Sequence, residues 1–218
     1  MLSIATGGRF RYKTDMKARP HRENPPAGFS LVELLVTLAL LSIMAVMLYG
    51  FGSASHQRTQ KELCHDHLQK IYLAMQIYAN DFGGTLPFKT NAVTSEDVLD
   101  ELVPHYTADT TIFICPGGRD AQIPSGEPLT QHKISYAYYM GRRLDAPQQV
   151  LMSDRQVDTE PKRAGEYVFS KNGKSPGNNH HKYGGNFLLG DGSVRSSGPQ
   201  APFSLAVPPG VVLLNPKP

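Results

Sequence analysis

Glu33 is an acidic residue inside a long apolar stretch near the N-terminus of this 218-residue chain. The stretch from Phe29 to Gly52 reads FSLVELLVTLALLSIMAVMLYGFG and has no other side chain that is charged at neutral pH. A carboxylate inside a bilayer costs at least about 2.5–3.5 kcal/mol, so Glu33 needs a positively charged partner. Hydrolysis of the peptide bond between Gly28 and Phe29 would supply one, because the new α-ammonium would lie one helical turn from Glu33.

A second group of residues that could take part in catalysis or metal binding lies nearer the C-terminus. His181 is followed, after KYGGNFLLG, by Asp191 and Gly192, and Asp154 follows an apolar run at 150–153. Asp191-Gly192 between apolar runs reads foremost as a hairpin turn, with glycine supplying a positive φ. Asp154 and Asp191 are also candidate calcium ligands. Calcium prefers about six to eight oxygens, so a nearby histidine argues against such a site.

The enzyme interpretation of this group is a membrane-tethered hydrolase, with or without zinc, that uses Asp154, His181 and Asp191. A catalytic zinc site needs three protein ligands and an activated water. The sequence contains no serine nucleophile elbow, no HExxH and no phosphate-binding loop. We therefore expect no enzymatic activity, and no cofactor unless calcium binds.

The apolar stretch is long enough to span a membrane. At 1.5 Å per residue it covers about 36 Å, against a hydrocarbon core of about 30 Å. A secretory signal peptide is the alternative, and Ser53 and Ser55 fit its small-x-small cleavage pattern loosely. Its apolar region should be only about 7–15 residues long, so a transmembrane helix over 29–52 is the better prediction.

The charge distribution orients this helix. Residues 1–28 carry six basic and two acidic side chains, a net charge of +4, whereas the whole chain carries +3, so the remainder is near −1. The positive-inside rule keeps the N-terminus in the cytoplasm and the C-terminal part outside. Because the basic excess is confined to the leader, we do not expect the rest of the chain to bind nucleic acid.

The segment AGFSLVELLVTLALLSIMAVML resembles the type IV prepilin motif. The resemblance implies that a membrane prepilin peptidase removes the leader, residues 1–28, between Gly28 and Phe29 and N-methylates Phe29. It further implies that Glu33 guides assembly. Many members have a proline in the second half of this helix, and this chain has none between Pro26 and Pro87. An ordinary membrane anchor with a stray glutamate is the alternative.

An amphipathic pattern continues the helix beyond the membrane. Apolar residues recur at alternating spacings of four and three, which predicts one rod over about 29–82 that ends near Gly83-Gly84. The segment LQKIYLAMQIYANDFGGTLP is similar to the corresponding stretch of type II secretion pseudopilins. The predicted apolar stripe consists of Cys64, Leu68, Ile71, Met75, Tyr78 and Phe82.

The predicted fold class is α+β and pilin-like, with the long N-terminal helix packed on a small antiparallel sheet. A short capped helix is expected at 95–103, with Thr94 or Ser95 as N-cap. The proline-rich tail should be extended or loosely docked. The expected parts are leader 1–28, transmembrane helix 29–52, amphipathic helix 53–84, head 85–197 and tail 198–218. The expected strands are 111–115, 134–139, 150–153, 167–169 and 186–189.

Cys64 and Cys115 are the only cysteines. Two cysteines exclude a cysteine-only zinc site, which needs about four, and permit one disulfide. The environment outside the membrane is oxidising, which favours a bridge between the helix and the head. Two buried free thiols are the alternative, since cysteine is a good small core residue.

His181, Asp191 and Gly192 also resemble the H-x9-DG signature that ends many prepilin-type proteins. Such proteins tend to have a Cys-Pro near mid-chain, as at Cys115-Pro116, and a Ser-Tyr strand, as at Ser135-Tyr136. A common variant has a second histidine after the DG, whereas this chain has Ser193. The departure weakens a metal-binding interpretation, and the role of the motif stays open.

The resemblance implies a structural subunit of a type II secretion pseudopilus or a type IV pilus-like fibre. Its partners would be prepilin peptidase, other pilin or pseudopilin subunits, an inner-membrane assembly platform and the lipid bilayer. It would be a single-pass protein of the bacterial inner membrane, with a periplasmic head, and part of a fibre after assembly. The alternative is a membrane-anchored head that binds glycan, DNA or a secreted cargo outside any fibre.

Overall fold

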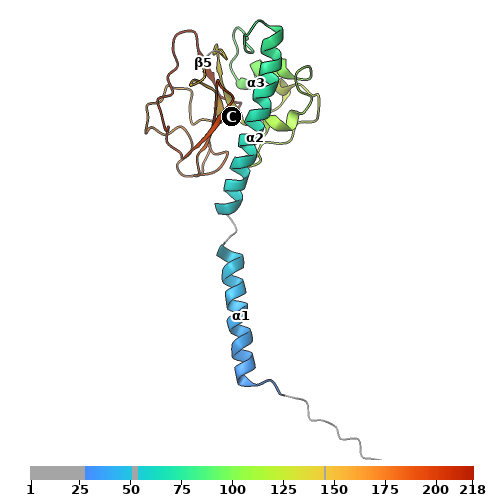
Figure 1. The fold of residues 1–218 in the computed structure, drawn as a ribbon, viewed down its shortest axis with the longest axis vertical. Coiled ribbons are helices and arrows are strands. Elements are labelled where there is room, and N and C mark those ends of the chain that lie inside the picture. The colour runs from blue at the N-terminus through green and yellow to red at the C-terminus, as the bar shows by residue number, and fades with distance from the viewer. Residues whose placement is uncertain (1–27, 51–53, 145) are drawn as a thin grey trace, which may run out of the picture. The chain divides into compact units, whose positions relative to one another are not determined.

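The first helix, α1 (Leu31–Gly50), is the apolar helix that the sequence predicts. The computed structural model describes residues 28–50, 54–144 and 146–218 of the chain. The chain divides into two units, Met1–Tyr49 and Gly50–Pro218 (Figure 1). Residues 1–27 of the predicted leader and the continuity of the predicted rod through 51–53 lie outside the described residues.

Helix α1 is long and apolar enough to cross a membrane by length and composition. Its segment Leu31–Leu48 has a mean hydropathy of 2.6, and none of that segment is buried within the chain. The hydroxyls of Thr37 and Ser42 donate to backbone carbonyls of their own helix, at 2.9 and 2.8 Å. Neither hydroxyl therefore needs a water partner in an apolar environment.

The second helix, α2 (Ala54–Asp81), runs alongside the head of the second unit (Figure 1). The predicted stripe is confirmed from Cys64 to Tyr78, all of whose stripe residues are buried. Phe82 is a correction, because its side chain is 51% exposed and stacks on the ring of Tyr78 at a centroid distance of 4.3 Å. Phe82 follows the last helical residue, so the helical spacing no longer directs it to the core.

Glycines end α2 at the predicted place. Gly83 has a φ of +61°, and the N–H of Gly84 donates to the carbonyl of Ala79 at 2.7 Å. This six-to-one hydrogen bond after a left-handed residue is the Schellman arrangement. It turns the chain sharply away from the helix axis toward the head.

The head is built on a five-stranded antiparallel sheet in the order β4-β3-β2-β1-β5. The fold is therefore α+β and pilin-like, as predicted, with one core between the sheet and α2 and a second core on the other face. The central strands β1, β2 and β3 are buried along their whole length. The strands are β1 (Tyr136–Met140), β2 (Val150–Asp154), β3 (Gly185–Leu189), β4 (Val194–Ser197) and β5 (Val212–Leu214).

Two predicted strands are wrong. Residues 110–113 form a short 3-10 helix, η2 (Thr110–Phe113), because the Asp109 carboxylate accepts the N–H of Thr111 at 3.1 Å and caps a turn there. Around 167–169 there is only an isolated bridge between Tyr167 and Gln200. The segment predicted as a tail contributes β5, which pairs with β1, and it buries Ala201, Leu205, Leu213 and Leu214 in the head.

The predicted helix at 95–103 is present as α3 (Ser95–Leu99), followed by the 3-10 turn η1 (Asp100–Leu102). Thr94 is its N-cap residue. The Asp97 carboxylate accepts the backbone N–H of Thr94 at 2.9 Å and that of Val93 at 3.0 Å. These bonds satisfy donors that a helix start leaves open. A further 3-10 turn, η3 (Leu129–Gln131), precedes β1.

Candidate functional site

The predicted processing segment is accessible at the start of α1. Gly28, Phe29 and Ser30 precede the helix in extended or irregular backbone, and the Phe29 side chain is 77% exposed. A Cβ built on Gly28 would meet no atom within 4 Å. Glu33 lies in the first turn of α1 and is also exposed. A bond placed in this way is open to attack by a peptidase.

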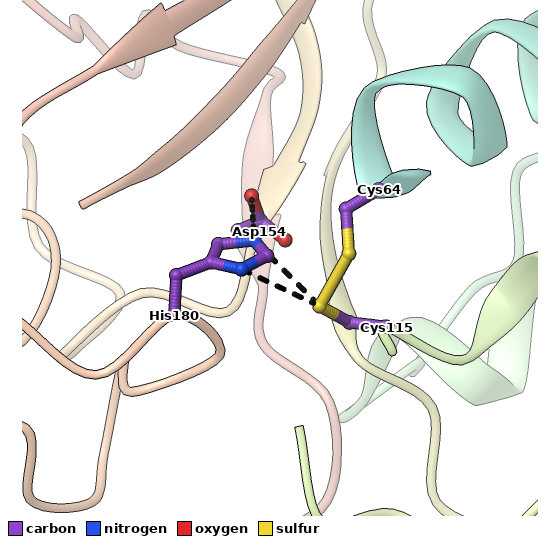
Figure 2. Close-up of side chains that lie close together, drawn as sticks. All are labelled: Cys64, Cys115, Asp154 and His180. Carbon is purple, nitrogen blue, oxygen red and sulfur yellow. Dashed lines mark hydrogen bonds and ion pairs between the residues drawn. A yellow bond between two sulfur atoms is a disulfide. The ribbon is translucent and has the colours of Figure 1, made fainter. Parts of the chain in front are cut away.

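The head contains a buried group of potential ligand side chains (Figure 2). Cys64 of α2 and Cys115 of the loop after η2 are joined by a disulfide across 51 positions of the sequence. On one side of the Cys115 sulfur lie the imidazole of His180 and, beyond it, the carboxylate of Asp154 (Figure 2). All four side chains are inaccessible to solvent. These four residues form the buried cluster: Cys64, Cys115, Asp154 and His180.

Hydrogen bonds hold Asp154 at the end of β2. Its carboxylate accepts the N–H of Asn186 at 2.7 Å and the amide of Asn179 at 3.0 Å, and lies 3.3 Å from Nε2 of His180. Burial raises the pKa of Asp154, but the charge of His180 and these hydrogen bonds outweigh it, so the pKa lies below its usual value. The group is an ionised carboxylate that Asn179, Asn186 and His180 hold in place.

Two glycines allow the chain to close around this pair. A Cβ on Gly117 would lie 2.7 Å from Nδ1 of His180, and a Cβ on Gly185 would lie 2.9 Å from the Cβ of Asp154. Any side chain at either position would therefore push the imidazole or the carboxylate away. The first glycine of the Cys-Pro-Gly-Gly run, Gly117, is thus explained by the close approach of backbone to His180.

The sequence singled out His181, whereas the structure brings its neighbour His180 to Asp154. His181 is only half-buried, adopts a positive φ of 52°, and faces a separate pocket. Adjacent histidines in an irregular segment give no periodicity from which to tell which one points inward. The H-x9-DG spacing between His181 and Asp191 led to the prediction of His181 as a site residue. In the structure Asp191 lies in a hairpin turn, and the two residues do not share a site.

Asp191 and Gly192 form the turn between β3 and β4. Gly192 has a φ of +81°, and the Asp191 carboxylate accepts the N–H and the hydroxyl of Ser193 at 2.9 and 2.6 Å. Those bonds lower the pKa of Asp191. The predicted hairpin turn is therefore present.

Asp154 and Asp191 do not share a site. Asp154 bonds to Asn186 at the start of β3, and Asp191 follows the end of that strand, roughly 15 Å away at about 3.3 Å per residue. The two carboxylates cannot ligate one calcium ion, and the triad of Asp154, His181 and Asp191 does not assemble.

A polar pocket of about 390 Å³ lies beside the buried cluster. Arg155 spans its wall, paired with Asp120 at 3.2 Å, and Asp120 also accepts the hydroxyl of Ser135 at 2.7 Å. Lys174 and His181 contribute further polar groups to the lining. The pocket presents more cationic than anionic side chains.

Comparison with known proteins gives one match. Residues 25–49 match the prokaryotic N-terminal methylation motif, which covers the predicted cleavage position between Gly28 and Phe29, Glu33 and nearly all of α1. Searches of curated proteins and of solved structures found no match. The motif and the exposed apolar helix that carries it are consistent with membrane anchoring, and they support the assignment of this chain as a prepilin-type protein processed by prepilin peptidase.

Proposed function

We propose that the mature chain is a structural subunit of a pilin-like fibre, either a type II secretion pseudopilus or a type IV pilus-like filament. Prepilin peptidase would cut after Gly28 and methylate the amine of Phe29. Copies of this chain or related subunits would then pack through α1, with the assembly platform extracting them from the inner membrane. The observation that carries this proposal is Glu33 in the first turn of an apolar helix whose segment Leu31–Leu48 is not buried by any of the residues that the structure describes.

Charge pairing gives this arrangement its driving force. After cleavage, the α-ammonium of Phe29 and the carboxylate of Glu33 would be about one helical turn apart, within one chain or between neighbours. In an apolar environment each charge is costly alone and much less so when paired. Methylation retains the positive charge of the amine, so the pairing survives it.

The helix surface suits both the membrane and a bundle. None of Leu31–Leu48 is buried within the chain. A helix that is apolar on all sides needs lipid or other helices around it. The bilayer would supply that environment before assembly, and neighbouring copies of α1 would supply it in the fibre.

A membrane-anchored binding module is the second candidate function. It is favoured by the pocket of about 390 Å³, where Arg119, Arg155 and Lys174 outnumber the single acid Asp120. Such a lining suits an anionic group on a glycan or a secreted cargo. This function requires the anchor but no fibre.

The two candidates are separated by deleting the ATPase that powers assembly in the native host. A fibre subunit should then disappear from the sheared surface fraction and accumulate in the inner membrane. A binding module should keep the same membrane distribution with and without the ATPase, and that result would contradict the fibre proposal.

A further inference from the structure

The buried cluster contains two polar side chains, Asp154 and His180, that a disulfide does not need. A disulfide is a neutral covalent link, whereas Asp154 and His180 are fully buried groups whose desolvation is costly. Cys115 Sγ lies 3.6 Å from Nε2 of His180, and that same nitrogen lies 3.3 Å from the Asp154 carboxylate. Two sulfurs, one imidazole nitrogen and one carboxylate oxygen therefore meet in one place, all within 4.8 Å of one another.

We propose that the buried cluster binds one zinc ion when Cys64 and Cys115 are thiols. Two thiolates, an imidazole and a carboxylate are the donor types that zinc takes in four-coordinate sites. Calcium and magnesium prefer oxygen donors and are poorly served by two sulfurs. Because all four residues are buried, the site is closed to substrate, and its role is structural rather than catalytic.

The distances suit tetrahedral zinc. With zinc about 2.3 Å from sulfur and about 2.0–2.1 Å from nitrogen or oxygen, neighbouring ligands lie about 3.6 Å apart for sulfur and nitrogen and about 3.4 Å apart for nitrogen and oxygen. The contacts of His180 with Cys115 and Asp154, at 3.6 and 3.3 Å, agree with these values. The two sulfurs would have to separate to about 3.8 Å, which breaking their bond permits.

The surroundings hold the ligands in place without the ion. The Asp154 carboxylate keeps its bonds from Asn179 and Asn186, and ligating carboxylates in zinc sites are commonly held in this way. Gly117 leaves room for the imidazole against the backbone. The hydrogen bonds from Asn179 and Asn186 that hold Asp154 beside His180 would therefore also orient Asp154 as a zinc ligand.

The two cysteines can first bind zinc and later form the disulfide. Every chain is made with two thiols, and zinc displaces their two protons to solvent as two zinc–sulfur bonds form. A disulfide-containing oxidant then accepts two electrons from the two thiolates and two protons from solvent, becoming a dithiol, while the bond between Cys64 and Cys115 forms and the zinc ion leaves to solvent. Zinc and the disulfide are thus alternative links between the same helix and head, one before oxidation and one after it.

Cobalt binding to the full-length chain in detergent tests this proposal. The chain is reduced with a phosphine under argon, cobalt is present during reduction, and thiolate-to-cobalt charge transfer and tetrahedral visible bands are recorded. Zinc stoichiometry is measured on parallel samples of the reduced chain and of the oxidised chain, whose disulfide is verified by thiol trapping and intact mass. We expect one ion per reduced chain and none per oxidised chain.

The adjacent histidines provide a matched pair of variants. His180→Asn should weaken zinc binding by at least about tenfold, since even outer partners of metal ligands contribute about 10–100-fold. His181→Asn should bind as the wild type does, and asparagine tolerates the positive φ at that position. Equal binding by the two variants would overturn the proposal, as would a reduced wild type without the charge-transfer band.

A measurement on the wild type decides the matter if His180→Asn fails to fold, as judged by its near-ultraviolet circular dichroism. Zinc should slow alkylation of Cys64 and Cys115 in the reduced chain by at least about tenfold. Magnesium at the same concentration should leave the rate unchanged. Alkylation at equal rates with zinc and with magnesium would overturn the proposal.

Discussion

Gly192 of the β3–β4 turn lies directly against the ring of Tyr72 on α2. A Cβ on Gly192 would be 2.4 Å from Cε1 of Tyr72, and the Tyr72 hydroxyl donates to the carbonyl of Gly190 at 3.0 Å. The turn at Asp191-Gly192 therefore packs the β3–β4 hairpin against α2. Packing as well as turn geometry therefore accounts for glycine at position 192.

Gly192→Ala should destabilise the head by about 2–4 kcal/mol, because it combines a positive φ with a steric overlap. Gly165→Ala is the matched control: its φ is +88°, but a Cβ there meets nothing within 4 Å. The control should cost only about 1 kcal/mol. Thermal unfolding of the full-length chain in detergent, followed by near-ultraviolet circular dichroism, measures both. Equal losses would show that the contact with Tyr72 contributes nothing.

His67 should make the stability of the head depend on pH. Burial is the largest influence and lowers the pKa of His67 below its usual value. Lys70 lowers it further, whereas the hydrogen bond to the Ile114 carbonyl and the charges of Asp66 and Asp109 raise it. The folded chain thus keeps His67 neutral at a pH where the unfolded chain already binds a proton.

The direction in which stability changes with pH depends on whether the folded or the unfolded chain binds more protons. Stability is fully present above about pH 6.5 and falls as the pH drops toward the folded pKa, because the unfolded state binds more protons in that window. His67→Gln retains a donor for Ile114 and should flatten that part of the profile. His56→Gln changes an exposed histidine and should leave the profile unchanged. A profile of His67→Gln that parallels the wild type would contradict the assignment. The groups that face His67 are Asp66, Lys70, Asp109 and the hydroxyl of Tyr136, which lies 3.5 Å from its Nδ1.

Parts of the fold were predictable because local patterns and long-range packing agree there. Buried stripe positions such as Leu68 and Met75, and the glycine stop after Asp81, follow from helical periodicity and backbone conformation alone. Strand β4 reads VRSS, a polar edge strand without an apolar signal, and β5 has only three residues. Strand β5 depends on pairing with the distant strand β1, which the local sequence does not encode, whereas β4 is held by the hairpin with its neighbour β3 rather than by an apolar pattern of its own.

The candidate site likewise contains some residues that the sequence could predict and others that it could not. The apolar run and Glu33 are local features and were found from the sequence, and the two cysteines could be paired because there were only two. His180 was missed because its burial depends on Gly117 and Asp154, which approach it from distant segments. The strand expected at 111–115 failed for a local reason, the cap from Asp109, which outweighs the β propensity of Ile112 and Phe113.

Gly28→Ala should leave the precursor uncut in the inner membrane. Among residues 28–50, 54–144 and 146–218 nothing opposes a methyl group at this position, since a Cβ there meets no atom within 4 Å. A loss of cutting would therefore reflect recognition by the peptidase rather than misfolding. Gel mobility and intact mass should show the leader retained, whereas Gly50→Ala, at the far end of α1, should be processed normally. Normal processing of Gly28→Ala would contradict the predicted cleavage position.

Glu33→Val should permit cutting but reduce sheared fibres by at least about tenfold, because an unpaired α-ammonium remains in an apolar bundle. Thr37→Val is the control one turn further along α1, where the hydroxyl bonds only to its own helix. It should assemble as the wild type does. Immunoblots of sheared and membrane fractions give the ratio, and normal assembly of Glu33→Val would show that the charge pair is not needed.

The central claim is that the leader is removed and a new amine is created at Phe29. N-terminal sequencing together with mass spectrometry of protein from native membranes tests it directly. We predict a first residue of N-methylated Phe29, followed by Ser30 and Leu31. A native protein that still begins with Met1 would contradict the account.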